Sequence, residues 1–519
     1  MSSNKLGCEA ARASETTPTP FCDATPLQAE PRNNHHAEAH NLGIEVEMSR
    51  TMTLNRLNPL DARWLMMESR DTPMHVGALL TFSIPDNAPD SFLYDMADSF
   101  RVSKKLERPW NLKLRNHRSS SVAPRTEEVS EIDLGYHFRH SALPHPGGER
   151  ELGILVSRLH SHPLDKQRPL WEMHLIEGLE FNRFAVYLKV HPALINGSDV
   201  VPILLQALSD NADDKNMPAF WTMNMHHETG EDLEEHQSPS HELMDTLNRA
   251  GDSLLSAGRI TSKAMKGMFA EGLKAPRLAP RSSLNGAVNN QRRFATQQYE
   301  YSRFEALAKA ADCTPNTILA YLCGSALRRF FKEYNALPDK PLVAAGALRL
   351  NDYADKYEEN DEREVMANIG ISLATHIADP LKRLQAVNRS MQRTREHLKK
   401  LPKEARAPYA LMTSLPQIAG QVPGIGRLVP SMFNVGISNA AVSDKPLYFN
   451  GAQLEAMYPM AHLMQYSALS FDSAIYAGTV NIGLTGARDT LPRLQRMALY
   501  MDQALNDLES LLLNEEASV

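Results

Sequence analysis

The chain has 519 residues, which is more than one ordinary hydrophobic core holds, so we expect two domains. A net charge of -7 and the absence of a basic stripe with interleaved aromatic residues argue against nucleic-acid binding. No apolar run in the sequence approaches the roughly 18 residues of a membrane-spanning helix, and the N-terminus has no apolar signal segment. We therefore expect a cytoplasmic protein and leave open a peripheral contact with the inner membrane face or with lipid inclusions.

The four cysteines, Cys8, Cys22, Cys313 and Cys323, are far apart and form no Cys-x-x-Cys pair. This spacing argues against a disulfide framework and a zinc site, and it suits a reducing compartment. We expect no metal and no tightly bound cofactor.

Residues 1–52 are predicted to be a disordered tail because they are rich in Ala, Glu, Thr, Pro and His and lack apolar periodicity. The histidine-rich stretch at 35–40 could bind a metal ion, but a solvated tail is the simpler interpretation. Met48 and Met52 precede sequence typical of a folded domain, so a translation start at one of them is a second hypothesis. The intact mass of the native protein would test it.

The N-terminal domain is expected at residues 53–211. Apolar runs predict strands, and apolar residues at helical spacing predict helices. The expected strands cover 74–84, 170–179 and 183–191, and the expected helices cover about 57–69, 90–100, 150–163 and 199–208, the last capped by Ser198 or Asp199.

A linker is expected at residues 212–292, where the composition becomes polar and rich in proline. Within it, Leu243, Leu247, Ala250 and Leu254 recur at spacings of four, three and four, which indicates one apolar face of a helix. That face could dock on the protein or lie on a lipid surface, and the sequence leaves both open.

The C-terminal domain is expected at residues 293–515. Helices are predicted at 301–312, 314–334 and 490–513, and strands at 340–350, 367–377, 446–460 and 469–486. Because strands and helices mix in both halves, we predict an α/β or α+β fold with two domains of similar make-up.

The stretch "FAVYLKVHPALINGSDVV", residues 184–201, reads as a buried strand that ends in a polar turn with one histidine. A neutral imidazole at a strand end between two domains can take a proton from an alcohol, which usually contributes about 10² to 10⁴ in rate. A site between domains would also exclude water and favour alcoholysis over hydrolysis. This pattern indicates acyl transfer.

From about residue 53 to 510 the chain resembles the bacterial wax ester synthase/diacylglycerol acyltransferase family. No single motif is specific, but together they are. The resemblance rests on "NPLDARWL", "PMHVGALLTF", "RPLWEMHLIEGL", "FAVYLKVHPALINGSD", "PRSSLNG", "LPDKPLVAAGALRL", "SLATHIADPLKRL", "NVGISNAAVSDKPLYFNGAQLEAMYPM" and "LPRLQRMALYMDQAL".

The resemblance implies two CoA-dependent acyltransferase domains of the chloramphenicol acetyltransferase type, with the site at their interface. The implied substrates are acyl-CoA and a fatty alcohol or diacylglycerol, and the implied product is a wax ester or triacylglycerol plus CoA. No bound cofactor is implied.

The family motif His-His-x-x-x-Asp-Gly falls on His191, Pro192, Asn196 and Gly197. Its second histidine is the family's general base, and that position is Pro192 here. Adjacent residues at a strand end point to opposite sides, so the His191 ring is expected to point away from the substrate channel. Replacement of the lost base by His191 is left open. Asn196 keeps the shape of the family's aspartate but loses its charge.

The resemblance also places substrate-binding positions at Pro169, Leu170, Trp171, Asn316, Asn368, Ser438 and Asn439. For Trp171 plain core packing is an equal alternative, and for Asn316 a place at a helix start. Departures from the family pattern occur at Thr317, Ala367 and 440–443, where the family has Asp, Gly and Val-Pro-Gly-Pro.

Two hypotheses follow for function. The first is an O-acyltransferase that makes neutral lipid from acyl-CoA. The second is a catalytically impaired paralogue that binds acyl chains or lipid inclusions, because the position of the general base is Pro192.

Overall fold

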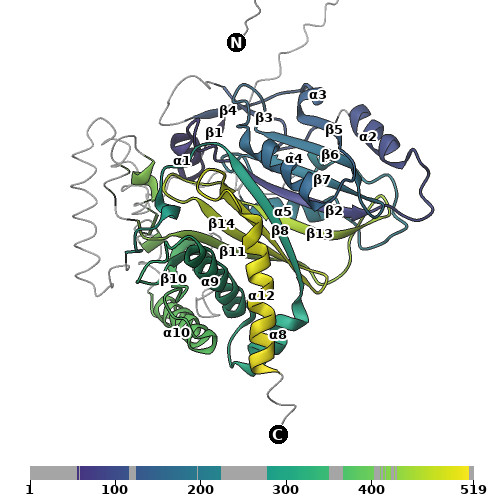
Figure 1. The fold of residues 1–519 in the computed structure, drawn as a ribbon. Coiled ribbons are helices and arrows are strands. Elements are labelled where there is room, and N and C mark those ends of the chain that lie inside the picture. The colour runs from purple at the N-terminus through teal and green to yellow at the C-terminus, as the bar shows by residue number, and fades with distance from the viewer. Residues whose placement is uncertain are drawn as a thin grey trace, which may run out of the picture. The chain divides into compact units, whose positions relative to one another are not determined.

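The computed structural model describes residues 55–513, except 58, 104, 116–123, 196, 224–277, 350–365, 402–408 and, between 411 and 430, residues 411, 412, 415, 416, 422–425, 427, 428 and 430. Residues 52–519 form one compact unit. Two six-stranded sheets organise it, and helices cover them (Figure 1).

The first sheet has the strand order β12-β13-β2-β7-β6-β5. Its N-terminal strands are β2 (Val76–Ser83), β5 (Phe138–Ala142), β6 (Trp171–Leu179) and β7 (Arg183–Val190). The edge strands β12 (Tyr448–Phe449) and β13 (Ala452–Met460) come from the C-terminal half of the chain. Strand β7 is almost continuously buried, because it lies between β2 and β6 and has apolar residues on both faces.

The described residues of the N-terminal half contain five helices: α1 (Pro59–Met67), α2 (Phe92–Val102), α3 (Leu134–His137), α4 (Glu149–Ser161) and α5 (Gly197–Gln206). A small third sheet joins β1 (Asn55–Arg56), β4 (Arg125–Glu128) and β3 (Leu112–Leu114). Short 3-10 turns occur at Phe220–Thr222 and Ser283–Asn285.

The second sheet has the order β10-β9-β11-β14-β15-β8. Its strands are β8 (Arg292–Glu300), β9 (Val343–Arg349), β10 (Met366–Ser372), β11 (Val435–Ser443), β14 (Leu469–Tyr476) and β15 (Thr479–Ala487). Four helices cover one of its faces: α8 (Tyr301–Ala310), α9 (Pro315–Glu333), α10 (Pro380–Lys399) and α12 (Gln495–Leu512) (Figure 1).

Strand β11 has one partly open edge. Strand β9 pairs with β11 only at Val435–Ile437, whereas β14 pairs with it from Gly436 to Ser443. From Ser438 onward this edge has no paired strand among the described residues. Asn439 and Ala441 are exposed although β11 lies inside the sheet.

The two sheets meet where β13 crosses from one half to the other. β13 forms antiparallel hydrogen bonds with β2 along most of its length. It also packs on β15, so closely that a Cβ atom on Gly483 would lie 2.1 Å from the carbonyl oxygen of Pro459. Glycine is therefore required at 483 for close approach of the two sheets.

The mixed α/β fold predicted from the sequence is confirmed, as are most of its expected elements. The prediction that Ser198 or Asp199 caps the fourth helix is wrong, because α5 begins at Gly197. The predicted tail and linker helix lie outside the described residues, and the domain boundaries stay a prediction. Among the described residues no helix is long and apolar enough to span a bilayer.

Candidate functional site

The motif loop, residues 191–195, follows β7 and precedes α5. The His191 amide donates to the Leu170 carbonyl at 3.0 Å, which ties the loop to the start of β6. The His191 carbonyl in turn accepts from the Leu194 amide at 3.0 Å and the Ile195 amide at 3.1 Å. The predicted positions Pro169, Leu170 and His191 are therefore brought together. Asn196 lies outside the described residues, and Gly197 is the first residue of α5.

The His191 ring is buried, with 1% of the residue exposed. Its Nδ1 atom accepts a hydrogen bond from the Ala193 amide at 3.1 Å, so the ring proton of the neutral form must be on Nε2. Nε2 lies 3.7 Å from Oε1 of Glu68, which follows α1. Neither ring nitrogen therefore offers a free lone pair to a substrate hydroxyl.

Burial lowers the pKa of His191 to about 4, although Glu68 opposes the shift and Lys166 adds to it. The ring is neutral at pH 7 as a result. A general base needs an acceptor nitrogen within reach of the proton that it takes. The geometry therefore speaks against His191 as a replacement base.

His462, just after β13, lies close enough to His191 for the two rings to interact electrostatically. Its ring meets the Trp64 ring edge-on at 4.9 Å, and burial with the nearby His191 lowers its pKa to about 4. Among the described residues, His191 Nε2, His462 Nδ1 and Trp64 Nε1 are buried without a hydrogen-bond partner. These three side chains form a buried polar cluster. The cluster connects α1 and the motif loop to the C-terminal half of the chain.

Trp171 is a core residue. Its indole N–H donates to the Trp110 carbonyl at 2.9 Å, and its ring stacks on Trp221 at 5.5 Å. It is 1% exposed. Of the two alternatives, the structure favours packing over substrate contact.

The C-terminal positions gather on the helix side of β11. The Asn439 side-chain amide donates to Oδ1 of Asn316 at 3.0 Å, and the Ser473 hydroxyl donates to Oδ1 of Asn439 at 2.9 Å. Thr314 caps α9 by accepting from the Thr317 amide, so the Asn316 side chain is not the cap. Asn316 and Asn439 are exposed, next to the open edge of β11.

Ser438 points to the opposite face of the sheet. Its hydroxyl donates to Oδ1 of Asp472 on β14 at 2.6 Å. Asp472 is 6% exposed, and burial raises the pKa of its carboxyl to about 6, while the Ser438 and Ser470 hydroxyls oppose that rise. Its Oδ2 atom is buried and has no hydrogen-bond partner among the described residues.

Asn368 stands apart from the other predicted positions. It lies on β10, at the edge of the sheet, and its side-chain amide donates to Oε1 of Gln417 at 3.0 Å. No contact among the described residues joins it to Ser438 or Asn439.

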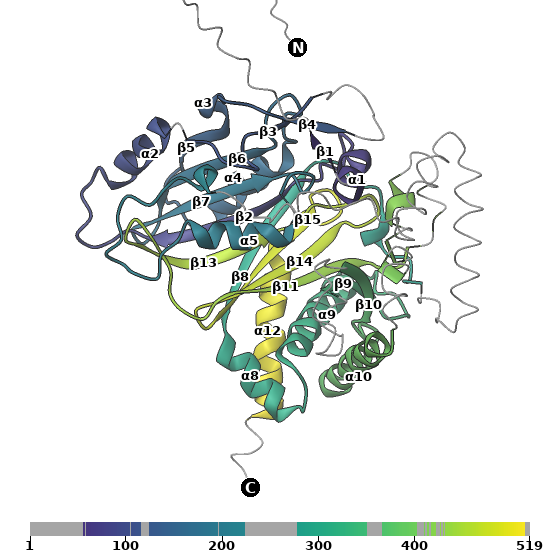
Figure 2. The same cartoon turned by 180° about the vertical axis from the view of Figure 1, so that it is seen from behind.

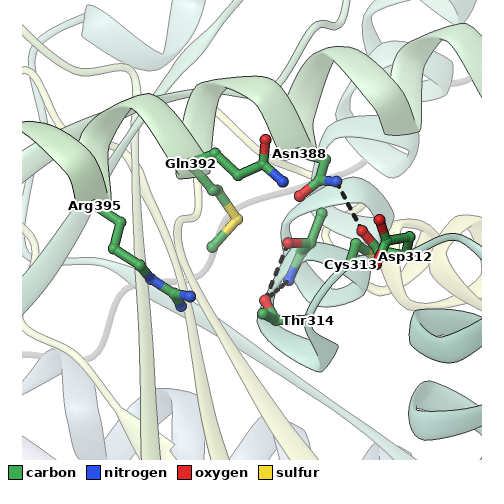
Figure 3. A pocket seen from close by; sticks show the side chains of 8 residues that line it. Asp312, Cys313, Thr314, Asn388, Gln392 and Arg395 are labelled. Atoms are coloured by element: carbon green, nitrogen blue, oxygen red, sulfur yellow. Dashed lines mark hydrogen bonds between the residues drawn. The ribbon is translucent and has the colours of Figure 1, made fainter.

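A pocket of about 200 Å³ lies between the start of α9 and α10 (Figure 3). Its lining includes Cys313, Thr314, Thr317, Asn388, Gln392 and Arg395. The Thr314 hydroxyl is engaged in capping α9, and Asn388 donates to the Asp312 carbonyl at 3.3 Å. Because Thr314 and Asn388 are already hydrogen-bonded within the pocket wall and the pocket lies away from the motif loop, we do not place the chemistry here.

Sequence reasoning missed Glu68, His462 and Asp472. Glu68 and His462 meet His191 only through the tertiary fold. Asp472 did leave a signal, since it is a lone acidic residue within the apolar run "LSFDSAIY". A carboxylate inside a buried strand is costly and is often functional.

Similarity to known proteins covers nearly the whole folded chain. The family described as the wax ester synthase/diacylglycerol acyltransferase catalytic domain matches residues 57–319, and the C-terminal domain of the same family matches residues 366–509. A putative diacylglycerol O-acyltransferase of Mycobacterium tuberculosis is 36% identical over 504 residues, which cover 88% of this chain and 98% of the relative.

An O-acyltransferase of Acinetobacter baylyi is 32% identical over 471 residues, with 89% of this chain and 98% of the relative covered. Among solved structures, the wax ester synthase/diacylglycerol acyltransferase of Marinobacter aquaeolei has a TM-score of 0.69 and 33% identity. That match covers 88% of this chain and 99% of the other.

Proposed function

Because the chain belongs to the wax ester synthase/diacylglycerol acyltransferase family, we propose that it transfers a fatty acyl group from acyl-CoA to a fatty alcohol or diacylglycerol. The products are a wax ester or triacylglycerol and free CoA. The observation that supports this most is the match over at least 98% of the length of relatives named as O-acyltransferases. The similarity thus extends over nearly the whole length of these relatives and is not confined to one motif.

The chemistry sets what the site must supply. The acceptor hydroxyl loses its proton as its oxygen attacks the thioester carbonyl, the C–O bond forms and the C–S bond breaks, and the proton ends on the CoA sulfur. The site must therefore provide a proton acceptor and hydrogen-bond donors for the developing oxyanion. Backbone N–H groups along the open edge of β11 would be groups of the second kind.

The second candidate is a catalytically impaired paralogue that binds acyl chains or the surface of lipid inclusions. It is favoured by the motif loop itself, where Pro192 occupies the position of the base and the lone pair on Nδ1 of His191 already accepts a hydrogen bond from the Ala193 amide. Proline has no side-chain acid or base and no amide N–H.

Product analysis separates the two candidates. Purified protein is incubated with palmitoyl-CoA and either hexadecanol or dioleoylglycerol, and the lipids are identified by mass spectrometry. The proposal expects hexadecyl palmitate or a triacylglycerol that is absent without enzyme. Acyl-CoA binding without either ester would establish the second candidate instead.

A further inference from the structure

We propose that Asp472 of β14 is the proton acceptor for the acceptor hydroxyl in this chain, in place of the histidine whose position is Pro192. The inference rests on the proposed acyltransferase function. It starts from the neighbourhood of Ser438, to which Asp472 is hydrogen-bonded.

The cross-strand register shows which way Asp472 points. Asp472 pairs with Ser438 of β11 on one side and with Gly483 of β15 on the other, so these three positions share one face of the sheet. The Cβ direction of Gly483 meets the Pro459 carbonyl of β13. Asp472 therefore faces the first sheet, away from the helices α9 and α12.

The same face reaches the motif loop. Tyr476, four residues after Asp472 on the same face of β14, belongs to one buried cluster with Ile195 of the motif loop and Val200 of α5. Val442 of β11 packs against that cluster. Figure 1 and Figure 2 both show α5 close to β13. Asp472 therefore lies on the face of β14 that packs, through Tyr476, into the cluster to which the motif loop belongs.

The carboxyl has the chemistry of a base. One oxygen is held by the Ser438 hydroxyl, while the other is buried and unpartnered among the described residues. Burial brings its pKa to about 6, near the pH at which a general base is most effective. The Cys323 thiol of α9 senses the Asp472 charge but has its own pKa raised by burial, so it stays protonated. An unpartnered buried carboxylate oxygen is costly for stability alone, and this points to a functional role.

The step balances without any co-reactant. Oδ2 of Asp472 takes the proton of the acceptor hydroxyl as the oxygen attacks the thioester carbon. When the tetrahedral intermediate collapses, the C–S bond breaks and the CoA thiolate recovers the proton from Asp472. The carboxylate is regenerated for the next turnover.

The test compares wild type with Asp472→Asn, which keeps the size of the side chain and an acceptor for Ser438. Rates with palmitoyl-CoA and hexadecanol are measured from pH 5 to 9. We expect kcat to fall by about 100-fold or more, with little change in the KM for acyl-CoA. The acid limb of the wild-type profile, expected near pH 6, should disappear. Asp507→Asn, an exposed position on α12, is the matched control and should leave the profile unchanged.

The double variant Asp472→Asn/Pro192→His separates catalysis from structure. A histidine at position 192 restores the base of the family, so turnover should return in the double variant. Its pH–rate profile should lack the acid limb that the Asp472 carboxyl gives to wild type. A double variant that stays inactive would show that Asp472 matters only for structure. If wild type is active and the kcat of Asp472→Asn lies within about twofold of it, the inference about Asp472 is overturned, while the proposed function stands. Wild type that is silent at every pH would overturn the proposed function as well.

Discussion

At position 191 a histidine is present, but its lone pair already accepts a hydrogen bond. At position 192, where the family has its general base, proline offers no proton acceptor. The Ala193 amide holds Nδ1 of His191, and the Nε2 proton points toward Glu68. Residues 191 and 192 therefore have different roles. His191 is a structural residue that ties the loop to α1, whereas Pro192 is the position whose change alters catalysis.

Pro192→His should increase turnover. A histidine there adds a second proton acceptor at the position of the family base, so we expect kcat with palmitoyl-CoA and hexadecanol to rise about tenfold or more at pH 7.5. Continuous detection of free CoA measures the rate. His191→Ala, which removes a ring without a free lone pair, serves as the comparison and should not abolish turnover. No gain in Pro192→His would contradict our alignment of the motif with the site.

Asp472→Asn should stabilise the protein at neutral pH. The folded-state pKa is raised from 3.8 to about 6, so the folded state binds the proton more tightly than the unfolded state. The contribution of Asp472 to wild-type stability is therefore largest below pH 3.8 and is lost as the pH rises to about 6. Two pKa units correspond to about 3 kcal/mol, an upper figure for what the variant gains above pH 6.

Urea unfolding at several pH values measures this difference. The gain of Asp472→Asn over wild type should grow between about pH 4 and 6 and then level off, following the titration of the carboxyl. A gain that does not change with pH would mean that Asp472 is not a buried carboxylate at neutral pH. A variant that is more stable but less active is the pattern expected where a site is built at the expense of stability.

Among the elements, the close contact between β13 and β15 constrains the distance between the two sheets at the site. It brings the face of β14 that carries Asp472 toward the first sheet. A Cβ atom at position 483 would meet the backbone of Pro459, which cannot move as a flexible side chain can. This contact sets the spacing of the two sheets on the face of β14 that carries Asp472.

Gly483→Ala should destabilise the fold and lower turnover. Forcing a methyl group into a packed layer costs about 1–3 kcal/mol or more in unfolding free energy, measured by urea denaturation. Gly153→Ala is the matched control, because its Cβ would find the nearest atom at an ordinary 3.5 Å and it lies in helix α4. That control should be neutral or slightly stabilising. Equal losses in both variants would mean that the sheets are not packed as closely as the structure has them.

The elements show how far the sequence can be interpreted alone. The buried strands β2, β6, β7 and β14 are mainly apolar, so their hydrophobic residues predict them. Helix α10 was not predicted, because it buries few side chains and one of these is Arg383. The positions in β11 came only from resemblance, since "VGISNAAVS" has no alternation. The pairings of Glu68 with His191 and of Asp472 with Ser438 depend on tertiary contacts that no local pattern records.

Across the whole molecule, each half of the chain contributes strands or core residues to the other half. β12 and β13 complete the first sheet although they come from the C-terminal half, and β8 supplies Phe294 to the cluster that includes Tyr187 of β7 and Val156 of α4. A site between the halves is therefore held by shared strands and a shared core. This rigid frame suits chemistry that depends on excluding water.

Separate halves should not fold independently. A fragment of residues 53–292 would leave the edge of β2 unpaired where β13 normally binds, so we expect it to aggregate or to unfold without a cooperative transition. Co-expression with residues 293–515 should recover soluble, cooperative material, as measured by size-exclusion chromatography and thermal unfolding. A fragment 53–292 that melts cooperatively by itself would contradict this account of the first sheet.

The central claim is that this chain catalyses acyl transfer even though Pro192 stands at the position of the family base. The most direct measurement is acceptor-dependent CoA release by the purified full-length protein with palmitoyl-CoA, with and without hexadecanol, at pH 7.5. The account predicts release that rises with hexadecanol and falls about 100-fold or more in Asp472→Asn. Release that does not respond to hexadecanol or diacylglycerol, from a protein that still binds palmitoyl-CoA, would contradict it.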